Sequence, residues 1–148
     1  MSLFTKLRKK ELEKQIKETW TAPQLSRIKR IGFDWRKGKN VTPQEFIDEF
    51  GFRGVEFGAS LPNNEKQQML NAAYDSFCDI AYLLDIKNRK QLSLNGMGLA
   101  FGSRGDGGKY AAAAHFEGDI NVINLTRMNG AGVLMHEYFH ARDWYINK

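Results

Sequence analysis

Apolar residues recur every three to four positions in several parts of the chain, the pattern of helices that bury one face. Residues 3–20 combine such a stripe with Lys and Glu at the other positions, which predicts an amphipathic N-terminal helix. A shorter pattern at residues 25–31 predicts a second helix that ends near Gly32. The most regular stripe follows Pro62 and continues to Leu84, and it predicts the longest helix of the chain.

A capping box marks the start of a further short helix. Thr42 is followed by Pro43 and, three positions after the threonine, by Glu45. Threonine and glutamate at this spacing satisfy each other's backbone N–H groups at a helix N-terminus, and proline is favoured at the first helical position. We therefore expect a helix that begins at Pro43 and stops at Gly51, because glycine commonly ends helices.

After the long helix the apolar period shortens towards two, which is typical of strands. The predicted strand segments are 54–58, 92–95, 99–101, 111–116 and 120–125. Gly118-Asp119 between the last two predicts a hairpin. The order of helices, strands and a final helix predicts an α+β fold with N-terminal helices, a small mostly antiparallel sheet and a C-terminal helix. The glycine-rich run 102–108, which contains Arg104, is expected to be a turn or flap because it lacks the lysine and spacing of a phosphate-binding loop.

Length and composition bound the class of protein. A chain of 148 residues with 42% hydrophobic residues corresponds to one globular domain with a sizeable core. The single cysteine, Cys78, lies in an apolar run and is expected to be a buried core residue in a reducing compartment. No secretory signal and no apolar run of membrane-spanning length is present, so the sequence predicts a cytoplasmic protein that does not enter a membrane.

The charge is concentrated at the N-terminus. Residues 1–40 hold twelve of the 22 Lys and Arg but only four of the 17 Asp and Glu, a net charge of +8 against −3 for the remainder. We treat residues 1–25 as a basic amphipathic arm. Such an arm is either a solvated helix face or a contact surface for an acidic partner, DNA among them.

The candidate chemistry lies close to the C-terminus, where residues 136–140 read H-E-x-x-H. On a helix, positions i and i+4 share one face, so His136 and His140 can both reach one metal ion. Glu137 is then placed to act as the general base on a metal-bound water. Zinc suits imidazole ligands and lowers the pKa of bound water, so the motif predicts a zinc cofactor and hydrolysis of an amide bond. The competing interpretation is a core helix whose histidines only form hydrogen bonds.

A zinc ion needs a third protein ligand, and the sequence leaves its identity open. Asp143 shares the helical face of His136 and His140, although it also suits a role in orienting His140. His115, on a predicted strand, is a candidate ligand or substrate contact. Further alternatives are Glu56, Glu117, Asp119 or a residue of a second subunit.

Two functional classes remain open from these residues. A metallopeptidase would bind a protein or peptide substrate, which the strand carrying His115 can hold by edge pairing, with Arg104 or Tyr138 stabilising the oxyanion. A non-enzymatic module would instead bind protein or nucleic acid through the basic arm and keep the metal for structure. A catalytic site keeps an open coordination position, whereas a structural site is closed by four protein ligands.

Several ordered runs together resemble a known family. They are Phe52–Gly58, Leu70–Asp75, Leu92–Gly96, Leu99–Gly105, Ala114–Glu117, Val122–Thr126, Gly130–Gly132 and His136–Asp143. These runs are similar to the first of the large polyvalent protein-associated domains, which occur in multi-domain proteins of phages and other mobile elements. The resemblance implies a zincin-like domain over residues 26–148, with His136 and His140 as metal ligands and Glu137 as the catalytic carboxylate. It also implies action in the cytoplasm of a bacterial host, and it names no substrate.

Overall fold

The computed structural model describes residues 2–3, 5–10, 30–59, 61–101, 114–118, 121–125 and 134–147. At positions 114, 115, 117, 135 and 136 it describes the backbone alone. Several predictions lie outside the described residues: the N-terminal helix beyond residue 10, most of the helix at 25–31, the boundary between residues 25 and 26, the segment with Arg104, and Asp119. Within these ranges, no helix is long and apolar enough to cross a membrane.

Four short strands form one sheet in the order β1-β2-β4-β3. The strands are β1 (Gly54–Phe57), β2 (Gly98–Phe101), β3 (Ala114–Glu117) and β4 (Val122–Leu125). β1, β2 and β4 are parallel to one another, and only β3 runs antiparallel, beside β4. Helices plus a small sheet agree with the α+β class in general, but the prediction of a mostly antiparallel sheet is wrong.

The connection between β1 and β2 explains the parallel pairing. Parallel neighbours need a crossover of a dozen or more residues. The 21-residue helix α4 (Asn63–Leu83) supplies it, with the 3-10 helix η1 (Arg89–Ser93) between α4 and β2. All four residues of β2 are buried, and so are all four of β4. Strands buried on both faces show no alternation that would reveal their direction.

The strand predicted at residues 92–95 is also wrong. Residues 89–93 form η1, whose N-cap Asn88 accepts a hydrogen bond from the backbone N–H of Lys90. Leu94 and Asn95 then adopt left-handed backbone conformations, with φ of 49° and 70°. The apolar spacing of this segment fits either a strand or a short turn of helix, and the local cap favours the helix.

The helix α3 (Pro43–Phe50) has the predicted caps. The Thr42 hydroxyl accepts from the Glu45 N–H, the Glu45 carboxylate accepts from the Thr42 N–H, and Pro43 occupies the first helical position. Gly51 ends the helix with φ of 73°. The long predicted helix is confirmed as α4, and the predicted hairpin is confirmed by β3 and β4.

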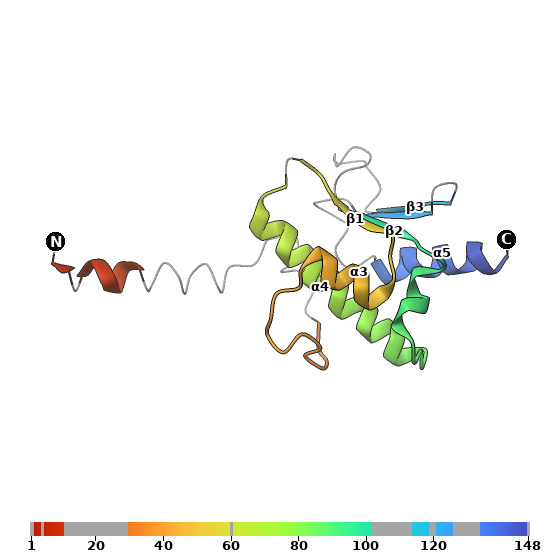
Figure 1. Cartoon of the computed structure of the whole chain (residues 1–148), viewed down its shortest axis with the longest axis horizontal. Helices are drawn as coiled ribbons and strands as arrows, with labels where there is room; N and C mark the ends of the chain where they lie inside the picture. Colours follow the sequence, from red (N-terminus) through yellow and green to blue (C-terminus); the bar gives the residue numbers. More distant parts are fainter. Residues whose placement is uncertain are drawn as a thin grey trace.

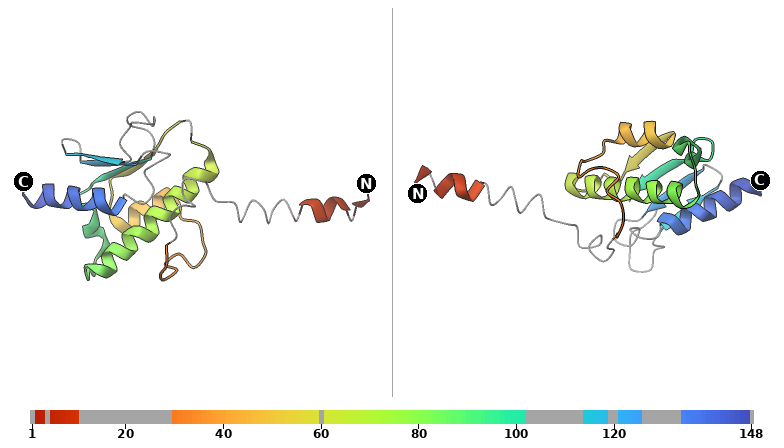
Figure 2. Two further views of the ribbon diagram at one scale, coloured as in Figure 1. Left: turned by 180° about the vertical axis from the view of Figure 1, so that it is seen from behind. Right: turned by 90° about the horizontal axis from the view of Figure 1, so that it is seen from below.

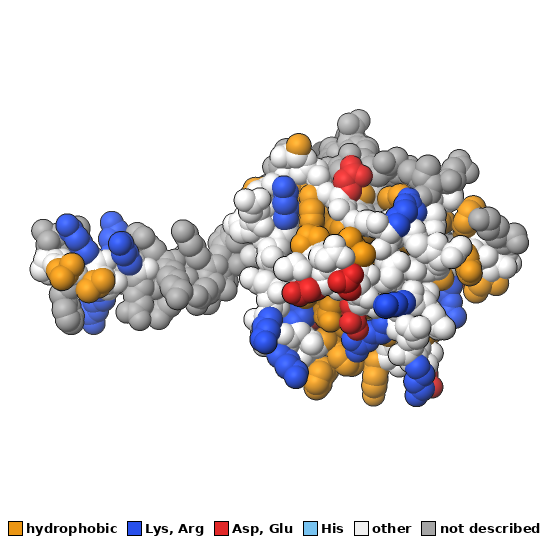
Figure 3. Space-filling view, in the orientation of Figure 1, with side chains coloured by type: hydrophobic (Ala, Val, Ile, Leu, Met, Phe, Trp, Pro, Cys, Tyr) orange, Lys and Arg blue, Asp and Glu red, His pale blue; other side chains and the backbone are white. Residues whose placement is uncertain are grey.

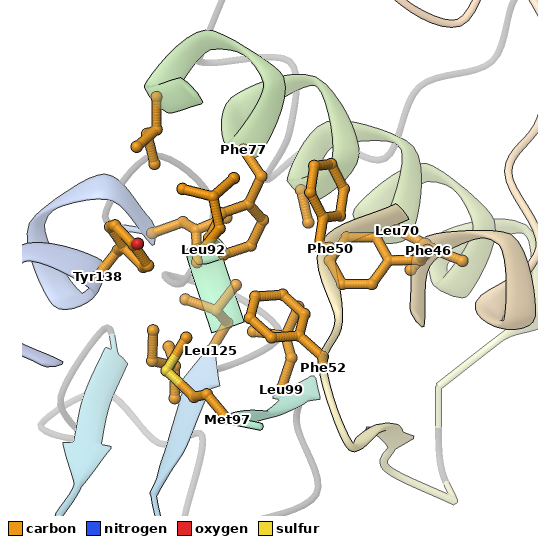
Figure 4. Close-up of a cluster of buried hydrophobic side chains, with 14 of the residues drawn as sticks. Phe46, Phe50, Phe52, Leu70, Phe77, Leu92, Met97, Leu99, Leu125 and Tyr138 are labelled. Atoms are coloured by element: carbon orange, nitrogen blue, oxygen red, sulfur yellow. The ribbon is translucent and has the colours of Figure 1, made fainter. Parts of the chain in front are cut away.

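Helices α3, α4 and α5 (Leu134–Ile146) lie on the same side of the sheet (Figures 1 and 2). Leu99 and Phe101 of β2, together with Ile123 and Leu125 of β4, belong to the same buried cluster as the apolar residues of these helices. Phe77 of α4 is central to that cluster, as Figure 4 shows. Cys78 is fully buried as predicted, and burial raises the pKa of its thiol to about 11.

The segment 30–42 packs along the outside of α4. Arg30 forms a bidentate ion pair with Asp79, at 2.6 Å for both bonds, and the Trp35 indole N–H donates to the same carboxylate at 2.8 Å. Arg36 pairs with Asp75. Two of the cations in the basic N-terminal region, Arg30 and Arg36, are therefore used inside the domain, whereas Lys37 and Lys39 are exposed.

Candidate metal-binding site

The H-E-x-x-H motif lies on α5, which is a continuous α-helix from Leu134 to Ile146. Leu134, Tyr138 and Ala141 are buried and recur at helical spacing, so they fix this side of the helix against the core. The Tyr138 ring meets the Phe77 ring of α4 edge to face, with centroids 5.5 Å apart. Because this side is fixed against the core, the direction in which each of the remaining residues of α5 points is fixed as well.

The predicted metal ligands lie on the side of α5 away from the core. At about 100° per residue, positions 136, 140 and 143 fall within an arc of roughly 60°. His140 and Asp143 are both exposed, and the side chain of His136 lies outside the described part. The structure therefore brings two of the predicted ligands to one accessible side of a regular helix. Among the side chains that are described, no group of three metal-binding residues is found.

Glu137 has a different environment from its neighbours in the motif. Its side chain is half-buried, about 100° round the helix from His136. Trp144, seven residues later and so on the same side of the helix, packs edge to face on Phe116 of β3 with ring centroids 5.8 Å apart. Glu137 therefore lies on the side of α5 that faces β3, between the exposed ligand positions and the sheet.

Tyr138 is a core residue in this structure. It is 1% exposed, and burial raises the pKa of its phenol to about 12, with the charge of Arg142 acting in the opposite direction. A phenol enclosed in the core between α4 and α5 does not line a surface that a substrate reaches. We therefore do not keep Tyr138 among the proposed substrate-binding residues.

The backbone of β3 places the other predicted residues. His115 pairs with Asn124 of β4, and Glu117 pairs with Val122. Successive strand positions alternate between the two faces of a sheet, so positions 115 and 117 belong to the face opposite Phe116, which packs on α5. Asp143 and His115 both stay candidates for the third ligand. Arg104 lies outside the described residues.

The contact between Trp144 and the β3–β4 hairpin is not predicted by the sequence. A Cβ on Gly118 would lie 3.0 Å from the indole, so the glycine allows the ring to approach the turn. The sequence around Gly118 predicts only a hairpin, and the sequence around Trp144 does not indicate which residue its ring contacts. The pairing of an aromatic near the end of the last helix with a hairpin glycine is not visible in either local pattern.

No protein-family model matches the chain, and neither does any curated protein or solved structure that was compared with it. The resemblance described above therefore stays a prediction.

Proposed function

We propose that the protein is a zinc-dependent hydrolase of the metallopeptidase type, with its metal held on α5. The observation that carries the proposal is the arrangement of α5: His140 and Asp143 are exposed on the side that also contains position 136, while Glu137 is half-buried towards β3. Imidazole and carboxylate are donor groups that zinc accepts. Zinc, when bound, would supply Lewis acidity and a lowered pKa for water.

The remaining residues would then have two roles, proton transfer and substrate binding. Glu137 takes a proton from the attacking water and returns it to the leaving amine, which needs a carboxylate beside the ligands rather than among them. β3 is at the edge of the described sheet and pairs on its inner side with β4. Its outer side would pair with an extended peptide, which makes a protein or peptide the favoured substrate. The phage or mobile-element origin and the bacterial cytoplasm belong to this proposal through the family resemblance alone.

Zinc content tests the site directly. Protein purified without added metal is expected to contain about one zinc ion per chain by elemental analysis, because two imidazoles and a carboxylate make a sufficient ligand set. His136→Ala and His140→Ala should both lose the ion. If Asp143 is the third ligand, Asp143→Asn should lose zinc. If His115 is the third ligand, His115→Gln should lose zinc.

The control is Asp85→Asn, which removes a carboxylate that is 84% exposed in the turn after α4. Circular dichroism establishes that each variant is folded. Equal zinc in wild type, His136→Ala and His140→Ala would rule out a metal site on this helix.

A second candidate function is supported by the N-terminal helix. Residues 5–10 are helical, and their Lys and Arg side chains are exposed together with Leu3 and Leu7, which are 75% and 57% exposed (Figure 3). An exposed helix with basic and apolar residues suits an acidic protein surface or nucleic acid. In this alternative the protein is a binding module, and the metal has a structural role.

Deletion of residues 1–20 tests the arm. We expect the full chain to bind a DNA duplex more weakly as salt is raised, because Lys and Arg release counterions from phosphates, with a slope of roughly 0.9 per phosphate contact. The truncated chain should show a smaller slope and a lower affinity at low salt. Fluorescence anisotropy at several salt concentrations measures both quantities. The same affinity and slope for both chains would show that the arm is only a solvated helix face.

A further inference from the structure

A hollow of about 370 Å³ opens at the end of the sheet where β2 and β4 begin and β3 ends. It is formed by three parts of the chain: the segment before β1, the turns that precede β2 and β4, and the C-terminal end of α5. Figure 1 shows the β3–β4 hairpin beside that end of α5. Its volume lies within the range of about 300–1,000 Å³ that is usual for small-ligand sites.

One wall of the hollow carries a positioned cation. Arg53 is exposed, and its Nη1 donates to the backbone carbonyls of Gly96 and Asn121, at 3.0 Å in each case. These two bonds connect the turn before β2 to the turn before β4 and fix the plane of the guanidinium group. Arginine held in this way is suited to bind an oxyanion with its planar set of donors.

A second part of the lining is aromatic. Trp144 is 39% exposed although its indole rests against Gly118 and Phe116, and the neighbouring Tyr145 is 44% exposed. An indole that is supported on one side and partly open on the other is a stacking surface for a planar ring.

Two carboxamides complete the lining. Asn95 and Asn121 both border the hollow, and neither side chain makes a hydrogen bond to the described residues. Both residues have left-handed backbone conformations, with φ of 70° and 54°. Asparagine accepts this conformation more readily than most residues. Asparagine side chains offer a donor and an acceptor together, which matches the edge of a nucleobase.

We propose that this hollow binds one nucleotide unit, with its phosphate at Arg53, its base stacked on Trp144 and the base edge at the two carboxamides. Arg53 supplies a cationic group to the described lining of the hollow, which suits a phosphate. A neutral sugar lacks the negative charge that this group complements. The unit is either a free nucleotide or part of a single strand of nucleic acid.

None of the described lining residues is a proposed metal ligand. Trp144 directly follows Asp143 in the chain, but it lies about 100° round α5 from it, on the side that contacts the hairpin. The inference therefore does not rest on the metal or on hydrolysis. It also involves no residue of the basic N-terminal helix.

The experiment measures the binding of deoxyadenosine monophosphate and of a short single-stranded oligodeoxyadenylate to the full chain, at low and moderate salt. Tryptophan fluorescence and anisotropy of a labelled oligonucleotide are the readouts. Arg53→Gln is expected to weaken binding at least about tenfold and to lower the salt slope by roughly 0.7, the contribution of one phosphate contact on a single strand. Lys87→Gln is the matched control, because it removes one exposed positive charge away from the hollow and should leave binding within about twofold.

Two further variants test the other walls. Trp144→Phe should remove most of the fluorescence quenching caused by the ligand. Asn95→Gly deletes a carboxamide while keeping a residue that accepts the left-handed backbone, and it should weaken binding several-fold. If Arg53→Gln fails to fold, Arg53→Lys keeps the charge without the planar donors and should also weaken binding.

The two probes identify the source of the nucleotide. Binding of both with similar affinity indicates a free nucleotide, and binding of the oligonucleotide alone indicates a single strand. The proposal is overturned if neither probe binds saturably, if adenosine or a monosaccharide binds as well as the phosphorylated ligand, or if Arg53→Gln and Lys87→Gln have equal effects.

Discussion

Protein in which Glu137 is replaced by glutamine should fold and bind zinc like the wild type, yet hydrolyse its substrate about 10²–10⁴-fold more slowly. Glutamine keeps the size of the side chain and removes the base. The half-buried position of Glu137, on the β3 side of α5 and about 100° from His136, places it beside the proposed ligands instead of among them. Loss of rate without loss of metal is therefore the expected signature of a catalytic carboxylate.

The proposal names a class of substrate, a protein or peptide, and no single molecule. The measurement is therefore a proteomic comparison of cleavage sites in a bacterial lysate. Cleavages that appear with the wild type and are absent with Glu137→Gln would support a peptidase. Asp85→Asn, a loss of carboxylate in an exposed turn, should cleave like the wild type. The enzyme assignment fails if zinc-loaded wild type produces no cleavage, or if Glu137→Gln cleaves as well as the wild type. The binding-module alternative would then be favoured.

Replacing Phe77 with alanine is expected to lower the free energy of unfolding by about 3–5 kcal/mol. The side chain is fully buried, and its ring lies 5.0–5.9 Å from the rings of Phe46, Phe50, Phe52 and Tyr138. Removing it leaves a cavity where α3, α4 and α5 meet. Since Tyr138 holds α5 in place through this contact, the same change should also disturb the side of α5 that carries the proposed metal ligands.

Urea unfolding followed by circular dichroism measures the effect as a shift of the midpoint at unchanged slope. Tyr82→Ala is the matched control on the same helix, since this ring is 75% exposed and its loss should cost about 0.5 kcal/mol or less. A destabilisation by Phe77→Ala no larger than that of Tyr82→Ala would contradict the description of the core.

The parts of the fold that depend on local chemistry follow from the sequence. Thr42 and Glu45 specify the start of α3 because a capping box is complete within four residues. The stripe along α4 specifies a long helix with one buried side, and Gly118 marks a two-strand hairpin. Each of these signals involves neighbours in the chain, so no knowledge of distant partners is needed.

The direction of the strands does not follow from local chemistry. β2 and β4 are buried on both faces, so neither has the alternation that separates an exposed face from a buried one. Whether β2 pairs in parallel with β1 is decided by the path of α4 across the sheet. A run such as Leu92–Asn95 is also too short for its period to separate a strand from a turn of 3-10 helix.

In the candidate site, too, some residues can be predicted from a local pattern and others cannot. His136, Glu137 and His140 form a motif that is readable within five residues, and Asp143 follows from the helical period. The position of residue 115 in the sheet needed the register of β3 against β4, which no local pattern contains. The hollow near Arg53 and Trp144 does not follow from any local pattern, because its residues are far apart in the sequence and are brought together by the packing of the domain.

The mixed sheet also has a consequence for how the chain folds. β3 and β4 are neighbours in sequence, so their hairpin closes a short loop, and α5 follows directly behind it. β1 meets β2 only after the whole of α4 and η1 has been brought back along the sheet. Closing that loop costs chain entropy before any parallel contact compensates for it. We therefore expect the hairpin and α5 to form early and the pairing of β1 with β2 to limit the folding rate, which leaves β2 as the strand exposed longest to association with other chains.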